Sequence, residues 1–155
     1  MASFEISIRK TLIFEGGYAD NSADHGGPTK FGIASESHPD LDIKNLTEEQ
    51  AIQIYKEQYW KVYYSQINDQ SVCDKLFDCG VLFGVGRAVK FLQSVLKVPV
   101  DGVFGPNTLA ELNSSDPGKV LLDYKTDLVQ HVIQIGANDP SQRQFVGGWL
   151  RRINS

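Results

Sequence analysis

One acidic residue near the start of the chain, Glu15, stands where an apolar segment stops and two glycines begin. Residues 2–14 carry apolar side chains at helical spacing, and Gly16 and Gly17 are typical of the positions after a helix. Glu15 is therefore expected at the end of a helix, where unpaired carbonyls create a partial negative charge that disfavours ionisation of a carboxyl group. A carboxylic acid that keeps its proton is what general acid catalysis requires.

The segment that follows, residues 18–33, is rich in Asn, Asp, Ser, Gly and Pro, which predicts a loop or a short hairpin. Cleavage of a glycosidic bond needs one acid that protonates the leaving oxygen, and a second carboxylate or a held water that deals with the sugar cation. Asp24 is the best second carboxylate, and the Thr29 hydroxyl can hold a water. By spacing alone, Glu15 and Asp24 can also be interpreted as solvated surface residues, which is the commoner role of isolated acids.

The elements that would position these residues are helices. Thr47 and Gln50 form a capping box, which predicts a helix from there to about Tyr64. Asn68 or Asp69 can begin the next helix, which is apolar nearly all round and is expected to be the buried centre. Its glycines at 80, 84 and 86 indicate close packing or a break near Gly84. The fold class is therefore mostly α, with one polar loop or hairpin after the first helix.

Three more helices are expected in the last third of the chain. Pro106 fits the first turn of one of them, after a turn at Asp101-Gly102. Residues 116–135 form the next, stopped by Gly136, and residues 139–153 form the last, with Trp149 expected in the core. Its cationic end, Arg151 and Arg152, is either a solvated helix end or a contact for carboxylate groups of a ligand. A set of tyrosines at helical spacing is expected on one face and mostly in the core: Tyr55, Tyr59 and Tyr63.

Composition excludes several classes of partner. The chain has 155 residues and a formal net charge of −4, with a pI of about 5.3, which argues against nucleic acid. No apolar run approaches the roughly 20 residues that span a bilayer, so stable membrane insertion is not expected. The N-terminus is not a standard signal peptide, so synthesis and folding in the cytoplasm are expected. Cys73 and Cys79 are expected to be reduced core thiols, and no metal site is expected.

The segment FEGGYADNSADHGGPTKFGI, residues 14–33, closely resembles the opening motif of the glycoside hydrolase family 108 lysozymes. The resemblance continues, in the family's order, through LTEEQAIQIYKEQYW, LFDCGVLFGVGRAVKFLQ, VPVDGVFGPNTLAEL and GWLRRI. It implies that Glu15 is the catalytic acid, and that Asp24 and Thr29 assist it. It also implies that Tyr18 lines the sugar cleft, and that Asp78 faces this cleft or anchors the fold.

The resemblance further implies the organisation and the reaction. We expect one compact lysozyme-like domain over residues 1–155, with a catalytic part (1–85) and a helical peptidoglycan-binding-like part (86–155) packed on it. The expected reaction is hydrolysis of the β-1,4 bond between N-acetylmuramic acid and N-acetylglucosamine in peptidoglycan, by a monomer without cofactor or metal. The family implies a phage or prophage endolysin that reaches the wall after holin-type release.

One departure from the family pattern leaves a non-catalytic role open, and a second alternative remains beside it. Leu82 stands where the family usually has an Asn, so a polar contact to substrate or backbone is missing. One alternative is a non-catalytic wall-binding or regulatory protein that kept the fold. The other is a lytic transglycosylase, which uses one Glu and makes an anhydro-sugar end instead of adding water.

Overall fold

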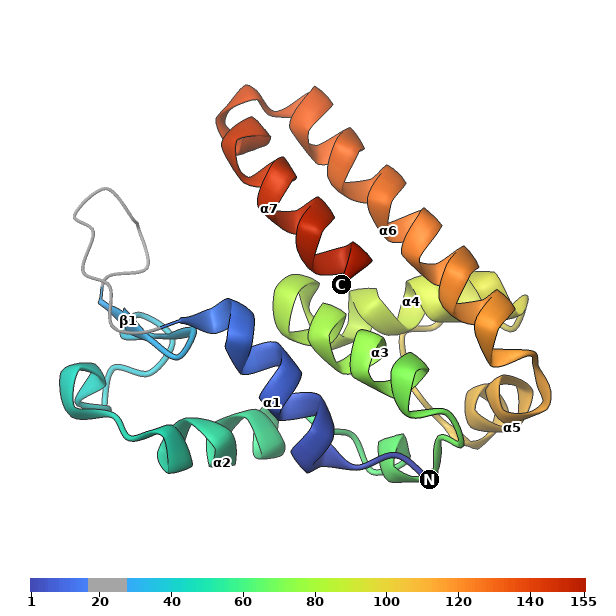
Figure 1. Ribbon diagram of the computed structural model, residues 1–155, viewed down its shortest axis with the longest axis horizontal. Coiled ribbons are helices and arrows are strands. Elements are labelled where there is room, and N and C mark those ends of the chain that lie inside the picture. The colour runs from blue at the N-terminus through green and yellow to red at the C-terminus, as the bar shows by residue number, and fades with distance from the viewer. Residues whose placement is uncertain (17–27) are drawn as a thin grey trace. The chain divides into compact units, whose positions relative to one another are not determined.

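The structure is a computed structural model that describes residues 1–16 and 28–155. The described chain forms two compact units. The N-terminal unit is Phe4–Trp60, and the C-terminal unit combines Met1–Ser3 with Lys61–Ser155. Helices and one two-stranded hairpin make up the regular structure of these residues (Figure 1). The predicted mostly α class is confirmed.

The N-terminal unit contains two helices and the hairpin. Helix α1 (Phe4–Glu15) begins the unit and α2 (Glu48–Tyr59) ends it. Between them lie β1 (Thr29–Lys30), β2 (Ile33–Ala34) and the 3-10 turn η1 (Ile43–Asn45). The core of the unit consists of the buried side chains of Phe4, Ile8, Ile33, Ile43, Leu46, Ala51 and Tyr55.

The predicted start of α2 is confirmed and its predicted end is wrong. The Thr47 hydroxyl accepts from the Gln50 amide at 3.2 Å, and the Gln50 side chain accepts from the Thr47 amide at 2.9 Å, which is the capping box. The helix ends at Tyr59 because Trp60 takes an extended conformation. Tyr64 lies instead in a separate 3-10 turn, η2 (Tyr64–Gln66), where its ring packs edge-on against another aromatic ring. Aromatic and β-branched residues such as those of 60–64 are mediocre helix formers, so tertiary packing decides their conformation.

The C-terminal unit is built on α3 (Gln70–Phe83), the buried central helix that the sequence predicts. Asp69 caps it by accepting from the Val72 amide at 2.9 Å, and every residue from 72 to 80 is buried. Gly84, with φ of 91°, ends α3 and precedes α4 (Val85–Leu96), so the predicted break is confirmed. Cys73 and Cys79 are free, buried thiols, as expected.

A buried glutamine organises the loop between α4 and α5 (Pro106–Ser114). The Gln93 carbonyl oxygen accepts from the amides of Asp101 and Gly102 at 3.1 and 2.9 Å. Its amide nitrogen donates to the Asp101 carboxylate, the Val103 carbonyl and the Thr108 hydroxyl, at 2.8, 3.1 and 3.2 Å. The predicted turn at Asp101-Gly102 is therefore present, with Gly102 at φ of 79°, and Pro106 stands in the first turn of α5.

The last two helices, α6 (Pro117–Asn138) and α7 (Arg143–Asn154), pack along each other (Figure 1). The prediction that Gly136 stops α6 is wrong, because the helix continues to Asn138. Gly136 is buried against α7, and a Cβ there would lie 2.6 Å from the Val146 side chain. Its role is close packing of two helices, which outweighs the low helix propensity of glycine.

The C-terminal end also differs from expectation. Trp149 is half-buried rather than part of the core, and its ring packs near the rings of Phe83 and Phe145. Within residues 1–16 and 28–155, none of the helices combines the length and the apolar character that a membrane span requires.

Candidate active site

Glu15 is the last residue of α1, as predicted from the glycine that follows it. Gly16 adopts φ of 55°, the left-handed conformation typical of the residue after a helix. The Glu15 side chain is half-buried, and the last turn of α1 contains no basic residue. The carboxyl group therefore stands at the carbonyl end of α1.

A tight hairpin turn lies directly against Glu15. Strands β1 and β2 are antiparallel, with Lys30 opposite Ile33, so the turn has two residues, Phe31 and Gly32. Their φ angles are 51° and 75°, the pattern of a type I′ turn. A Cβ at Gly32 would overlap the carboxylate of Glu15. Only glycine lets the turn backbone approach the acid this closely.

Two tyrosines of α2 complete the surroundings of Glu15. The buried Tyr55 donates its hydroxyl to the Phe31 carbonyl at 2.8 Å, which ties the hairpin turn to α2. Tyr59 lies one helical turn further on, with its ring 5.5 Å from that of Tyr55. Burial, and secondly the Glu15 carboxylate, raise the pKa of Tyr59, so its phenol stays protonated. The acid thus lies beside a glycine turn and near two phenol side chains.

The structure places the other predicted catalytic residues as follows. Thr29 begins β1, opposite Ala34, on the same hairpin whose turn contacts Glu15. Asp24 and Tyr18 lie outside the described residues. Sequence reasoning assigned Tyr55 to the core, which its burial confirms, but it missed the contact between the Tyr55 hydroxyl and the hairpin. Because that contact joins residues 24 positions apart, no local pattern in the sequence announces it.

Asp78 lies in the C-terminal unit and is 5% exposed. Its carboxylate accepts from Nε of Arg152 at 3.1 Å to each oxygen, and from Nη2 at 3.0 Å. The Lys75 ammonium donates to the Arg152 carbonyl at 2.8 Å. The geometry matches the anchoring role that was one of the two expectations for Asp78, since it attaches α7 to α3; a substrate contact stays a prediction. For Arg152 the expectation of a solvated helix end is wrong, because the arginine lies on the inner face of α7.

Tyr63 and Leu82 also bear on the expectations. Tyr63 is half-buried and precedes η2, so it does not continue the helical face of Tyr55 and Tyr59 as predicted. Leu82 lies near the end of α3 and is half-buried. Within the described part of the chain, no group of three or more His, Cys, Asp or Glu residues is placed to hold a metal ion.

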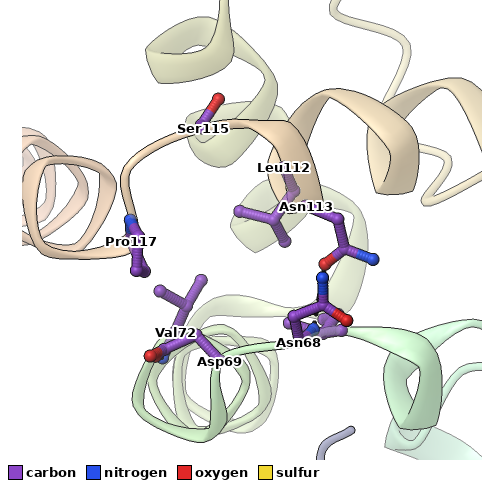
Figure 2. A pocket seen from close by; sticks show the side chains of 8 residues that line it. Asn68, Asp69, Val72, Leu112, Asn113, Ser115 and Pro117 are labelled. Carbon is purple, nitrogen blue, oxygen red and sulfur yellow. Dashed lines mark hydrogen bonds between the residues drawn. The ribbon is translucent and has the colours of Figure 1, made fainter.

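A small pocket in the C-terminal unit is shown in Figure 2. Its volume is about 60 Å³, room for a few water molecules, whereas ligand sites measure roughly 300–1,000 Å³. The Asn68 amide donates to the Asn113 side chain at 2.9 Å, and that side chain donates to the Gln66 carbonyl at 2.9 Å. These polar groups thus hold the N-terminal end of α3 to α5. We assign this pocket a structural role and not substrate binding.

Comparison with known proteins matches two consecutive segments of the chain to family models. The family model described as Glycosyl hydrolase 108 matches residues 8–84. A second model, described as Predicted Peptidoglycan domain, matches residues 87–154. Among solved structures, Brucella abortus SagA is similar, with a TM-score of 0.81 and 28% sequence identity over 97% of this chain and 89% of that chain. A search of curated proteins finds no match.

Proposed function

Because the chain belongs to the glycosyl hydrolase 108 family, and is thus a glycosidase that degrades peptidoglycan, we propose that it is a lysozyme with Glu15 as its general acid. The bond cleaved would be the β-1,4 bond between N-acetylmuramic acid and N-acetylglucosamine. Glu15 would protonate the bridging oxygen as the bond breaks. The observation that carries this proposal is the contact of the Glu15 carboxylate with Gly32 in the hairpin turn.

This contact supports a catalytic role because the acid is held by elements that are themselves braced. The end of α1 supplies Glu15, the turn restricts its carboxylate, and Tyr55 of α2 holds the turn through the Phe31 carbonyl. Phe31 is a bulky residue at positive φ, an uncommon conformation that persists only where the surroundings enforce it. A solvated surface glutamate would need none of these constraints.

After Glu15 has protonated the leaving oxygen, Asp24 and Thr29 would assist the attack of water on the sugar. Asp24 would stabilise the positive charge that develops on the sugar, or position the attacking water, and Thr29 would help to hold that water. Tyr18 would line the sugar cleft. These three assignments rest on the family motif, and Thr29 has the added support of its place on the hairpin that contacts Glu15.

Clearing of permeabilised Gram-negative cells, followed by turbidity, tests the role of Glu15. The variant Glu15→Gln keeps the size of the side chain and removes the acid. We expect its rate to fall by about 10²–10⁴-fold, the usual contribution of a general acid. Glu36→Gln, at an exposed position just after β2, is the matched control and is expected to clear cells like the wild type. Equal clearing by the Glu15→Gln variant would remove Glu15 from the mechanism.

Mass spectrometry of the released fragments tests the type of reaction. Hydrolysis adds water and leaves a reducing N-acetylmuramic acid end, whereas a lytic transglycosylase leaves an anhydro end that is lighter by one water. We propose hydrolysis, so products that all carry the anhydro end would contradict this part of the proposal. A chain that binds walls without releasing any fragment would support the non-catalytic alternative.

The biological setting follows from the same proposal. We propose that the enzyme acts on the cell wall as a monomeric endolysin of a phage or prophage, released by a holin. Its support is the resemblance of the opening motif to phage muramidases. Expression in the cytoplasm with and without a co-expressed holin tests the route, since lysis is expected only with the holin.

A further inference from the structure

A cationic pocket in the C-terminal unit is lined by residues that have no part in the proposed reaction. Its volume is about 430 Å³, within the range of roughly 300–1,000 Å³ that is typical of small-ligand sites. Its lining comes from α4, from α6 and from the loop after α4, and consists of Arg87, Lys90, Phe91, Ser94, Val100 and His131.

The residues that α4 contributes are spaced to face one way. Positions 87, 90, 91 and 94 follow the i, i+3, i+4, i+7 pattern of a single helix face. Arg87 and Lys90 are exposed, and neither makes an ion pair or a side-chain hydrogen bond within residues 1–16 and 28–155. The side-chain stem of Lys90 packs near Gly102, because a Cβ at Gly102 would lie 3.1 Å from the Cε of Lys90. Both charges are thus available to a ligand.

The base of the pocket is aromatic. The His131 ring lies 4.9 Å from the ring of Phe91, and 5.5 Å from the ring of Phe83 in an edge-on arrangement. Burial, and secondly Arg87, lower the pKa of His131, so the imidazole is neutral at pH 7. Its Nε2 is shielded from water and makes no hydrogen bond within the described chain. Within the described residues, the pocket therefore combines two cations without an ion-pair partner, two aromatic rings and one polar nitrogen without a hydrogen bond.

We propose that this pocket binds carboxylates of the peptide stems of peptidoglycan, an inference that rests on the proposed function. The chain carries a net charge of −4, yet the lining of this pocket includes two cations and no acid. A cationic lining in an acidic protein selects an anionic ligand. In peptidoglycan the glycan strand is uncharged, and the free carboxylates belong to the stems. Arg87 pairs with one carboxylate through its planar fork and Lys90 acts as a point charge, while the aromatic base contacts the apolar side chains of the stem.

A soluble ligand without a glycosidic bond tests this pocket separately from catalysis. We would titrate the full chain with the stem tetrapeptide L-alanyl-γ-D-glutamyl-meso-diaminopimelyl-D-alanine and follow it by NMR. Binding is expected to shift the aromatic signals of Phe91 and His131. The double variant Arg87→Gln, Lys90→Gln is expected to raise the dissociation constant about tenfold or more, as loss of charge-assisted hydrogen bonds does. Amidation of the peptide's carboxylates should weaken binding to a similar extent.

The control is the double variant Lys97→Gln, Lys119→Gln, which removes the same charge from exposed positions outside the pocket lining. It is expected to bind the tetrapeptide like the wild type. The proposal is overturned if the Arg87, Lys90 variant binds as tightly as this control, or if the amidated peptide binds as well as the acid. It is equally overturned if a polyglycerol phosphate binds the pocket and the tetrapeptide does not.

Because the tetrapeptide offers no bond for a glycosidase to cleave, these results do not depend on Glu15. Failure of the proposed function would be seen in the clearing assay with Glu15→Gln, whatever the peptide binds. A second measurement extends the test to the wall. Cosedimentation with intact sacculi should be weakened by the Arg87, Lys90 substitutions and unchanged by the Lys97, Lys119 substitutions; equal weakening by both pairs would contradict recognition of stem carboxylates by this pocket.

Discussion

Replacing Gly32 by alanine tests the contact on which the active site depends. The backbone at this position has φ of 75°, where a residue with a Cβ costs roughly 1–2 kcal/mol. The new methyl group would also lie 2.5 Å from the Tyr55 hydroxyl and would overlap the Glu15 carboxylate. Since carbon contacts are favourable at about 3.5–4.0 Å, both groups must move by about 1 Å or more.

Stability and activity should therefore respond very differently to the Gly32→Ala substitution. Backbone strain of roughly 1–2 kcal/mol lowers the melting temperature by only about 3–6 °C in a chain of this size. A catalytic group displaced by about 1 Å, in contrast, loses on the order of 100-fold in rate. We expect a folded protein with a rate near 1% of the wild-type value, measured as turbidity clearing and as release of soluble fragments.

The chain offers a matched control for this substitution. Gly84 also has positive φ, 91°, but a Cβ there would meet nothing within 4 Å. Gly84→Ala should show a similar loss of melting temperature and full activity at room temperature. If Gly32→Ala is as active as Gly84→Ala, the turn does not position Glu15 and the reasoning is refuted.

Three further predictions concern stability. Arg152→Met removes the guanidinium group that pairs with the buried Asp78 carboxylate and should cost about 3–5 kcal/mol in urea unfolding. Adding Asp78→Leu should restore most of that loss, and a double variant no more stable than the single one would contradict the ion-pair assignment. Gln93→Leu removes the hydrogen bonds that the part-buried Asp101 and Gly102 amides and the Val103 carbonyl make with this side chain and should cost about 3 kcal/mol. A loss below about 1 kcal/mol would show that the loop does not depend on Gln93. Burial raises the pKa of Cys79 to about 12, so the folded thiol stays protonated while the unfolded one ionises near pH 9. The contribution of the protonated Cys79 thiol to the free energy of unfolding is present below about pH 9 and is lost as the pH rises towards 12. Cys79→Ala should therefore reduce the fall in the free energy of unfolding at alkaline pH. If the free energy of unfolding falls with pH as steeply in the variant as in the wild type, Cys79 does not cause this fall.

Local signals in the sequence predicted the elements that local chemistry determines. Gly16 after an apolar helix located Glu15, the Thr47–Gln50 pair located the start of α2, and Gly84 located the break after α3. In each case a cap or a positive φ angle acts within a few residues, so one stretch of sequence contains the whole cause.

The errors arose where distant packing decides the structure. Gly136 was expected to stop α6, but its lack of a side chain serves the contact with Val146 of α7. Arg152 was expected in solvent, and it is buried because Asp78, more than 70 positions earlier, faces it. Spacing within one helix does not reveal the partner on another.

The hairpin turn shows the same limit at the candidate site. Residues 18–33 predicted a loop or hairpin, and β1 and β2 confirm the hairpin. Phe31 is an unusual choice for the first position of a type I′ turn, which favours Asn, Asp or Gly. The contacts of this turn with Glu15 and Tyr55 depend on three separate segments, so they could be found only in the structure.

The most direct test of Glu15 as the general acid of a muramidase is to count and identify the new reducing ends. Purified sacculi would be digested with the wild type, Glu15→Gln and Glu36→Gln, and the products reduced with borohydride before analysis. We predict that the wild type and Glu36→Gln release reducing N-acetylmuramic acid ends, detected as muramitol after the reduction, at equal rates, and that Glu15→Gln releases them about 10²–10⁴-fold more slowly. Reduced ends on N-acetylglucosamine, or equal rates with Glu15→Gln, would contradict the account.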